Sequence, residues 1–450
     1  MRKTLVLWLA LAAAPALATP LFAQVPFGPD ERFRTDVLCV FGHPDDEVLV
    51  GSLLSRLAFD QKKRLAMVYC TRGGMGANEV GCEHAQALAD VREIEGRDAL
   101  AFWGVTRAWF LDAPDTPGQD VLRSLSGWRE GTILERVVRL MRITRPRVVL
   151  TFLPAMTVGE CHGDHQAAGV IATEAFDLAG DPSAFAHQLA APRDPTRSGN
   201  FGEGLAAWQP QKLYYFSDAD ATVFLDGKGP AYRSSEVSPS KQRTYQHLAA
   251  EEASRQDSQD VGVIAKQFLR TNKFPLLLDP ERLAFARAAV PHTTSGDIFE
   301  NTTDAPVAFA PPVRTARPPA RGVWLELGGA WAFYRELHRA HGLTHLDDVP
   351  APEASTDSAH AVRVPLLLHN DGTQPVDAVL RPALPPGWIA TAGAGAYRLE
   401  PHATWPVEAR VLAKGQNGTR GAVRWDLDAG AQGATSVSLS ACLSGNDLPQ

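Results

Sequence analysis

Two groups of histidines and carboxylates carry most of the chemistry that this sequence offers. The first, His43-Pro44-Asp45-Asp46-Glu47, directly follows the apolar run Val37–Phe41. The second, His162-Gly163-Asp164-His165, comes after the apolar run Val148–Phe152. Burying imidazoles and several carboxylates at the end of a strand is unfavourable unless a cation binds them. The two groups together therefore predict a metal site.

Zinc in a hydrolase takes three protein ligands from histidine and carboxylate and keeps one position for water. The ligands that we expect are His43, Asp46 and His165. They would hold one Zn²⁺ per chain, although nitrogen and oxygen donors also accept iron, cobalt or nickel. We expect Asp45 to be the general base for the zinc-activated water and His162 to be the acid toward the leaving group. Asp164 is expected to hydrogen-bond His162 and fix its tautomer.

Each group also has a purely structural interpretation. Acidic residues from Asp45 to Glu47 are favourable in the first turn of a following helix, where they interact with the helix dipole. Asp164 can likewise be the N-cap of a helix that begins at Gln166. Either motif alone leaves both interpretations open, and their coincidence at one edge of a sheet favours the metal site.

Short apolar runs alternate with longer amphipathic ones over the first half of the chain. The expected strands are Val37–Phe41, Leu65–Cys70, Ala108–Leu111, Val148–Phe152 and Lys212–Phe216, and the expected helices are Val48–Phe59, Glu83–Trp103, Gly131–Thr144 and Gln166–Leu178. This alternation predicts an α/β fold, a Rossmann-like parallel sheet with helices on both faces. Ligands bind beyond the carboxyl ends of such strands. The two histidine groups and the glycine-rich loop Thr71–Glu79 are all expected at that edge.

The rest of the chain changes in character. Ser238 to Arg270 is expected to form one further helix, and Ala305–Arg321, rich in proline and alanine, a linker. From about Val362, short alternating runs separated by turns predict an all-β sandwich. The expected organisation is a signal peptide (1–23), a catalytic domain (30–300), a linker with some helix (301–358) and the sandwich (359–450).

The N-terminus is typical of an exported protein. Arg2 and Lys3 precede an apolar stretch, Leu5–Leu17, and Ala16-Leu17-Ala18 is a cleavage signal, with a second possible cut after Ala23. A bacterial periplasmic or secreted protein is expected, with no membrane span after cleavage; an uncleaved anchor is the alternative. The net charge of −7, with scattered lysines and arginines, argues against a nucleic-acid partner.

Five cysteines are an odd number for an exported chain. Cys39 and Cys70 end apolar runs and are expected to be buried thiols. Cys82 and Cys161 lie in the loops expected beside the site, and we hypothesise that they form a disulfide.

The paired histidine motifs resemble those of the PIG-L/LmbE family of zinc-dependent de-N-acetylases. The resemblance extends from about Asp36 to Arg270, and lesser features support it. These are Thr71-Arg72-Gly73, Arg92 with Glu95, Phe110-Leu111 leading to Pro114-Asp115, and Trp208-Gln209-Pro210-Gln211-Lys212-Leu213-Tyr214-Tyr215. The resemblance implies that His43, Asp46 and His165 are the zinc ligands and that Asp45 is the general base. It also implies that His162 stabilises the oxyanion and protonates the amine. The family commonly has alanine or a similar small residue before the first histidine, and this chain has Gly42 there, a mild departure that leaves the ligands intact.

The same resemblance implies an N-acetylglucosamine unit, attached to another group, as the substrate. The candidates for contacts to sugar hydroxyls are Arg72, Asn78, Glu79 and Asp115, with loop solvation as the alternative for each. For Arg92 and Glu95 the alternative is an ion pair on a helix surface. The C-terminal region resembles the immunoglobulin-like domains of bacterial glycan-active enzymes through Leu384-Pro385-Pro386-Gly387-Trp388. We expect it to pack against the catalytic domain, with Trp388 and Trp405 in its core.

The sequence thus predicts a metal-dependent amidohydrolase that removes acetyl groups from N-acetylated amino sugars. An amidase for another amide, such as a thiol–sugar conjugate, and a non-catalytic glycan-binding protein are the alternatives. A serine hydrolase is not expected, because the chain lacks a Gly-x-Ser-x-Gly elbow. A dinucleotide-binding site is also not expected, since Glu79 stands where the last glycine of that fingerprint would be.

Overall fold

The fold is described from a computed structural model, which covers residues 30–155, 162–190, 203–217, 224–273, 279–316, 322–347, 353–356, 361–416 and 418–443. The expected signal peptide and Cys161 lie outside these residues. Within them, no helix has both the length and the apolar character that crossing a membrane requires.

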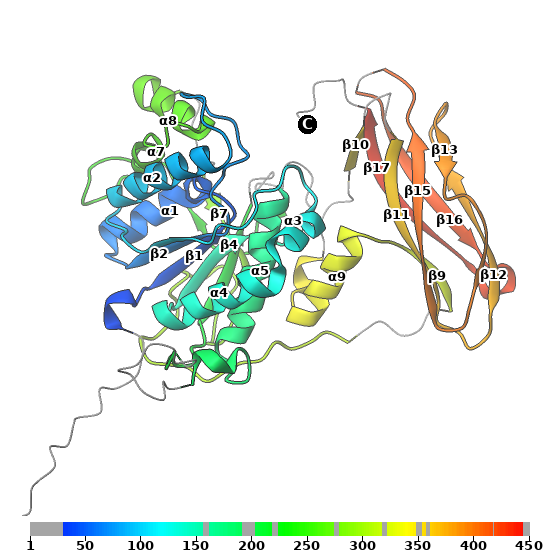
Figure 1. Cartoon of the computed structure of the whole chain (residues 1–450), viewed down its shortest axis with the longest axis horizontal. Coiled ribbons are helices and arrows are strands. Elements are labelled where there is room, and N and C mark those ends of the chain that lie inside the picture. Colours follow the sequence, from blue (N-terminus) through cyan, green and yellow to red (C-terminus); the bar gives the residue numbers. More distant parts are fainter. Residues whose placement is uncertain are drawn as a thin grey trace, which may run out of the picture.

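A six-stranded sheet with the order β3-β2-β1-β4-β5-β8 forms the centre of the first part of the chain (Figure 1). Its five parallel strands match the five expected apolar runs: β1 (Val37–Phe41), β2 (Leu65–Tyr69), β3 (Ala108–Phe110), β4 (Val148–Phe152) and β5 (Lys212–Phe216). The edge strand β8 (Ala284–Ala288) is antiparallel to β5. A short ribbon pairs β6 (Ala231–Tyr232) with β7 (Glu281–Arg282).

Helices cover both faces of this sheet, because successive residues of a strand point to opposite sides. Leu38 and Val40 of β1 join a core with residues of α3 (Val121–Trp128), α4 (Glu130–Thr144) and α5 (Gly163–Ala179). Val37, Cys39 and Phe41 face a second core, to which α1 (Gly51–Ser55), α2 (Gln86–Phe102) and α7 (Tyr245–Ala253) contribute. The α/β class expected from the sequence is confirmed.

The helix expected at Val48–Phe59 is present but irregular. It begins as a 3₁₀ helix (Asp46–Val50), continues as α1 and ends as a π-helical turn (Arg56–Asp60). Further 3₁₀ turns occur at Glu31–Phe33, Ala186–Gln188, Thr344–Leu346 and Gly430–Gln432.

The prediction of a single helix at Ser238–Arg270 is wrong, because the structure has two helices there. α7 begins after Thr244, whose side chain caps it, and α8 (Asp260–Thr271) follows a break. At this break the side chains of Gln256 and Gln259 turn inward and are buried. Polar groups that find buried partners outside the helix favour such an interruption.

The chain between the two main parts contains a strand and a helix. β9 (Val323–Leu327) pairs with β11 (Ala361–Asn370) of the C-terminal region, and α9 (Ala330–His341) follows it directly. Together with β10 (Glu353–Thr356), this means that each sheet of the C-terminal region includes a strand that precedes residue 359.

Two sheets make up the C-terminal region. Their orders are β13-β15-β11-β9 and β10-β17-β16-β12-β14, and the remaining strands are β10 (Glu353–Thr356), β12 (Val376–Ala383), β13 (Ile389–Ala392), β14 (Gly395–Leu399), β15 (Ala403–Leu412), β16 (Arg420–Asp428) and β17 (Ala434–Leu443). Residues of both sheets share one core, as in a sandwich. Trp388 lies in this core as expected, but Trp405 is 53% exposed. Its neighbours Thr404 and Pro406 are also exposed, so this end of β15 lies outside the packed core.

Candidate metal centre and active site

A tight turn follows β1 and arranges the first motif. The Asp46 carboxylate closes this turn, because its Oδ2 accepts hydrogen bonds from the backbone N–H groups of Gly42 (2.8 Å) and His43 (2.9 Å). Asp45 has a φ of 105°, a conformation that residues other than glycine rarely adopt. Its N–H donates to Glu47 Oε2 at 3.1 Å. Backbone strain of this kind concentrates at functional sites.

The second motif forms the start of α5. His162 is the N-cap, and its Nδ1 accepts the N–H of Asp164 at 3.2 Å. The ring of His165 stacks on Phe152, the last residue of β4, with centroids 4.1 Å apart and planes 8° from parallel. Because β1 and β4 are neighbouring parallel strands, the two motifs emerge at the same edge of the sheet.

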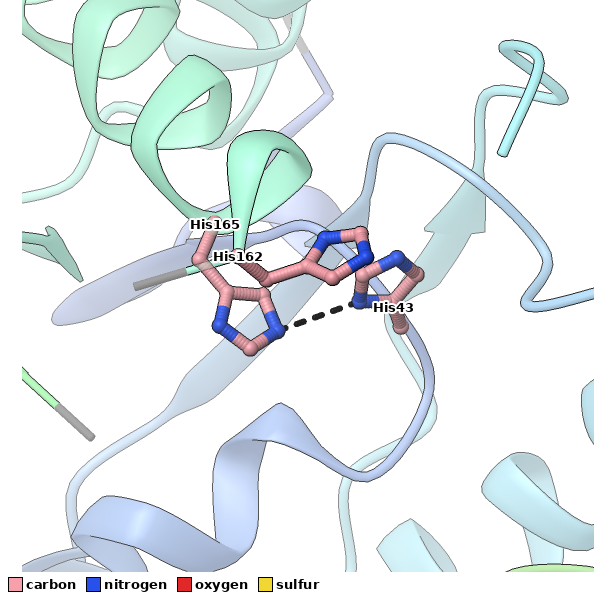
Figure 2. Close-up of side chains that lie close together, drawn as sticks. All are labelled: His43, His162 and His165. Atoms are coloured by element: carbon pink, nitrogen blue, oxygen red, sulfur yellow. Dashed lines mark hydrogen bonds between the residues drawn. The ribbon is translucent and has the colours of Figure 1, made fainter. Parts of the chain in front are cut away.

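One atom from each of the three expected ligands, His43, Asp46 and His165, forms the corner of a triangle at this edge. His165 Nε2 lies 3.2 Å from His43 Nδ1 and 3.1 Å from Asp46 Oδ1, and the last two atoms are 3.8 Å apart. Figure 2 shows the rings of His43 and His165 facing each other, with His162 beside them. Zinc bonds of about 2.0 Å at a tetrahedral angle separate ligand atoms by about 3.3 Å. The donor set and its spacing therefore fit a divalent cation.

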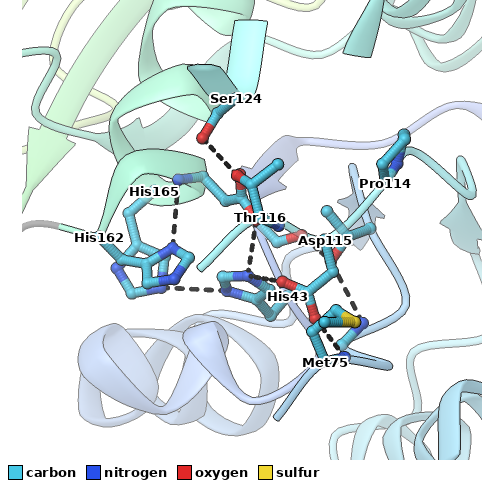
Figure 3. A network of polar contacts seen from close by, with 12 residues as sticks. His43, Met75, Pro114, Asp115, Thr116, Ser124, His162 and His165 are labelled. Carbon is cyan, nitrogen blue, oxygen red and sulfur yellow. Dashed lines mark hydrogen bonds and ion pairs between the residues drawn. The ribbon is translucent and has the colours of Figure 1, made fainter. Parts of the chain in front are cut away.

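A second layer of carboxylates orients His43 (Figure 3). Its Nε2 lies 3.2 Å from Asp115 Oδ1 and 3.2 Å from Asp164 Oδ2. Carboxylates accept hydrogen bonds, so a proton belongs on Nε2, and Nδ1 is the atom that faces the triangle. This is the usual way in which outer groups fix a metal-binding histidine.

The expected contact of the Asp164 carboxylate with His162 is wrong. This carboxylate is fully buried and contacts His43, and it accepts hydrogen bonds from Thr116 N (2.9 Å) and Thr116 Oγ1. The tautomer of His162 is set instead by the backbone N–H of Asp164, which occupies Nδ1. A neutral His162 therefore carries its proton on Nε2.

The charges around the triangle favour a cation there. Burial opposes a charge on His43, but the carboxylates of Asp115, Asp164 and Asp46 raise the pKa of His43 well above its usual range. Burial also opposes a charge on Asp46, yet His165 and His43 hold the pKa of this carboxyl far below its usual range. Both shifts come from the mutual attraction of imidazoles and carboxylates that are held close together in this pocket.

The two residues expected to handle protons have opposite shifts. Burial, and then the Asp46 carboxylate, raise the pKa of Asp45 well above its usual range. Burial, and then the charges of His43 and His165, lower the pKa of His162 to about 4. Asp45 therefore gains affinity for a proton, whereas His162 is neutral at pH 7.

Of the four candidates for sugar contacts, Asp115 joins the histidine cluster. Its Oδ2 also accepts the N–H of Met75, which ties the glycine-rich loop to the site at 2.9 Å. Arg72 forms ion pairs with Asp90 (2.6 Å) and Glu93 (2.9 Å) on α2. Asn78 donates to Glu83 within its own loop, and the N–H of Glu79 donates to Ser258 O.

Several residues that position the site were not found from the sequence. Thr116 Oγ1 lies 2.6 Å from Ser124 Oγ, which extends the support of Asp164 to α3. Arg92 is buried and donates to the carbonyls of Gly73 (2.6 Å) and Ala77 (2.8 Å), which holds the glycine-rich loop. The surface ion pair considered for Arg92 and Glu95 is therefore wrong. In the sequence, Thr116 could have been noticed as a polar residue that directly follows Asp115.

The cysteines agree only in part with expectation. Cys39 and Cys70 are buried free thiols, as expected. Cys82 is exposed and is a free thiol in this structure, and Cys161 lies outside the described residues. The structure thus gives no support to the hypothesised disulfide.

Comparisons with known proteins show which families and proteins this chain is similar to. Residues 38–176 match the family model PIG-L, described as GlcNAc-PI de-N-acetylase. Among curated proteins, the chain is 32% identical over 199 residues to 1D-myo-inositol 2-acetamido-2-deoxy-alpha-D-glucopyranoside deacetylase 1 of Frankia alni, covering 40% of this chain and 62% of that protein. The protein of the same name in Catenulispora acidiphila is 28% identical over 187 residues, covering 38% of this chain and 56% of that protein.

Among solved structures, N,N'-diacetylchitobiose deacetylase from Pyrococcus horikoshii is similar over 58% of this chain and 86% of its own, with a TM-score of 0.40 and 19% identity. The chain spans little more than half of the length of the curated relatives. Residues 38–176, the segment that the family model matches, contain both histidine motifs.

Proposed function

We propose that this chain is an exported, divalent-metal-dependent hydrolase that removes the acetyl group from an N-acetylated amino sugar or its conjugate. The observation that carries the proposal is the triangle of His43 Nδ1, Asp46 Oδ1 and His165 Nε2, with a strained, half-buried Asp45 and a histidine donor beside it. The targeting signal at the N-terminus supports export.

The chemistry divides between the cation and the side chains. A divalent cation, zinc in our proposal, would be held by His43, Asp46 and His165, and it would supply acidified water and polarise the amide carbonyl. Asp45 accepts the proton of the attacking water, a role that its raised pKa favours. His162 donates its Nε2–H to the carbonyl oxygen as negative charge develops there.

We propose a source for the proton of the departing amine that differs from the one expected from the sequence. Only a protonated His162 could act as the acid, because a neutral imidazole donates a hydrogen bond but does not release its proton at this pH. The lowered pKa of the half-buried His162, about 4, favours the neutral ring at pH 7. We therefore assign both proton transfers to Asp45, which passes to the amine the proton that it took from water.

The substrate class rests on the relatives. The curated relatives are named as deacetylases of a 2-acetamido-2-deoxyglucopyranoside, and the matching family model carries a de-N-acetylase description. A substrate whose amide is attached to a sugar ring also carries ring hydroxyls. These hydroxyls need a hydrogen-bond acceptor at the rim of the site. We assign this contact to Asp115, whose carboxylate links His43 to the glycine-rich loop.

The decisive experiment measures acetate release from N-acetylglucosamine and its glycosides, using metal-stripped protein reloaded with zinc, iron, cobalt or nickel. His43→Ala should lose bound metal, whereas Asp45→Asn should keep the metal and lose turnover. Sugar binding without acetate release would indicate a glycan-binding protein, and release of only another acid would indicate a different amidase. An Asp45→Asn variant as fast as the wild type would overturn the assignment of the base.

A further inference from the structure

We propose that α9, the helix that leads from the sandwich back to the α/β part, positions the histidines of the second motif. The proposal rests on the function proposed above, because it concerns the same site. Tyr334 and His338 of α9 hold the two ends of the segment that carries His162. They are positioning residues, since they reach the site through other groups.

α9 packs as part of the α/β core. Tyr334 and Leu337 are buried in the same core as the residues of α3, α4 and α5, together with Leu343 and Leu346 just after the helix. Figure 1 shows α9 beside α5, between the α/β part and the sandwich. Buried apolar contacts of this extent make α9 a fixed element of the α/β part.

The first polar contact lies at the start of α5. Tyr334 OH donates to Gln166 Oε1 at 2.5 Å, and both side chains are buried. Gln166 follows His165 directly, and its backbone N–H donates to His162 O at 3.0 Å. A displacement of Gln166 therefore moves both histidines, because all three residues belong to one helical turn.

The second contact lies at the other end of the segment. His338 is 1% exposed, and its Nε2 donates to Pro154 O at 3.0 Å while its Nδ1 lies 2.7 Å from Asp347 Oδ1. Pro154 follows Phe152 by two residues, and Phe152 is the ring on which His165 stacks. His338 thus holds the chain where it leaves β4.

A third contact offers a matched control. His341, one turn further along α9, lies with its Nδ1 2.6 Å from Asp177 Oδ2 near the end of α5. Asp177 also pairs with Arg287 at 2.7 Å. Losing the His341 contact should loosen α9 about as much as losing the His338 contact, but far from the histidine motif along α5.

The experiment compares Tyr334→Phe, His338→Ala and His341→Ala in the full-length chain. The readouts are the zinc dissociation constant from chelator competition, the visible spectrum of the cobalt-loaded protein, and backbone hydrogen exchange at residues 162–166 without metal. We expect Tyr334→Phe and His338→Ala to weaken zinc binding by about ten-fold, as the loss of a group that supports a metal ligand does. We also expect both to alter the cobalt spectrum and speed exchange at residues 162–166, while His341→Ala changes none of these.

Rescue separates positioning from general stability. His338→Gln keeps an amide donor for Pro154 O and should recover most of the zinc affinity that His338→Ala loses. Equal zinc affinities and spectra in all variants, or equal losses in His341→Ala, would overturn the proposal. These readouts need no substrate, so an absence of deacetylase activity would contradict the proposed function and leave this test intact.

Discussion

A buried carboxyl group behind the first motif allows a quantitative test of the structure. Glu281 accepts the backbone N–H groups of Ser52 and Leu53, each at 2.9 Å, where α1 begins. Burial raises the pKa of Glu281 to about 7 in spite of these hydrogen bonds. In the unfolded chain the same group has its ordinary pKa of 4.5. Between these values the native state binds more protons than the unfolded state, so stability falls as the pH rises.

The change that tests this is Glu281→Gln, which keeps an acceptor for Ser52 and Leu53 but cannot ionise. Ionisation of Glu281 lowers wild-type stability by about 1.4 kcal/mol at pH 5.5 and by about 3.4 kcal/mol at pH 8.0, from the pKa values of 4.5 and about 7. The free energy of unfolding of the variant minus that of the wild type should therefore increase by about 2 kcal/mol from pH 5.5 to pH 8.0.

Urea unfolding at both pH values, at matched metal content, measures this difference. Glu83→Gln is the control, because Glu83 is exposed on the same part of the molecule and its replacement should not change with pH in this way. A difference between Glu281→Gln and the wild type that stays constant between pH 5.5 and 8.0 would refute the reasoning. It would mean that Glu281 ionises in the native state at its ordinary pKa.

Three further predictions concern the site. Asp115→Asn should weaken zinc binding by about ten-fold in chelator competition, because it removes one of the carboxylates that orient His43. Gln256→Leu should lower kcat while zinc content stays unchanged, since Gln256 Nε2 donates at 2.7 Å to Glu47, which holds the N–H of Asp45. An unchanged kcat would show that this support is dispensable. Cys82 should react with iodoacetamide in the native, unreduced protein, as seen by peptide mass, because its thiol is free and exposed; an unlabelled Cys82 would restore the disulfide hypothesis.

The expected ligands could be named from the sequence because both motifs follow strong strands. The runs at Val37–Phe41 and Val148–Phe152 are fully buried, and the first motif begins just after its run, whereas the second begins ten residues after its run, at the start of α5. Parallel strands deliver such ends to one edge, so proximity follows once the strands are recognised. Neighbouring strands in the sheet, β1 and β4, then bring His43 within 3.2 Å of His165.

The second layer could not be predicted in the same way. Thr116 and Ser124 reach Asp164 from a loop and from α3, and this depends on how those segments pack rather than on any local pattern. For Arg92, a surface ion pair with Glu95 stayed open as the alternative, but its guanidinium donates to the carbonyls of Gly73 and Ala77 in the glycine-rich loop. The break between α7 and α8 has the same origin, since buried contacts of Gln256 outweigh the local preference for a continuous helix.

The spacing of the second motif has a physical reason in the start of α5. An N-cap side chain accepts the N–H of the second or third helical residue, and His162 does so with Asp164. Gly163 stands between them because a Cβ there would lie 2.8 Å from Ser124 Oγ and 3.0 Å from Asp120 O. With its backbone bound to His162, Asp164 turns its carboxylate to His43 and leaves His165, one residue later, facing the triangle. One residue thus sets which nitrogen carries the proton in two different rings. The pattern His-Gly-Asp-His therefore combines helix capping with the orientation of the candidate metal ligands, and neither role alone would require all four positions.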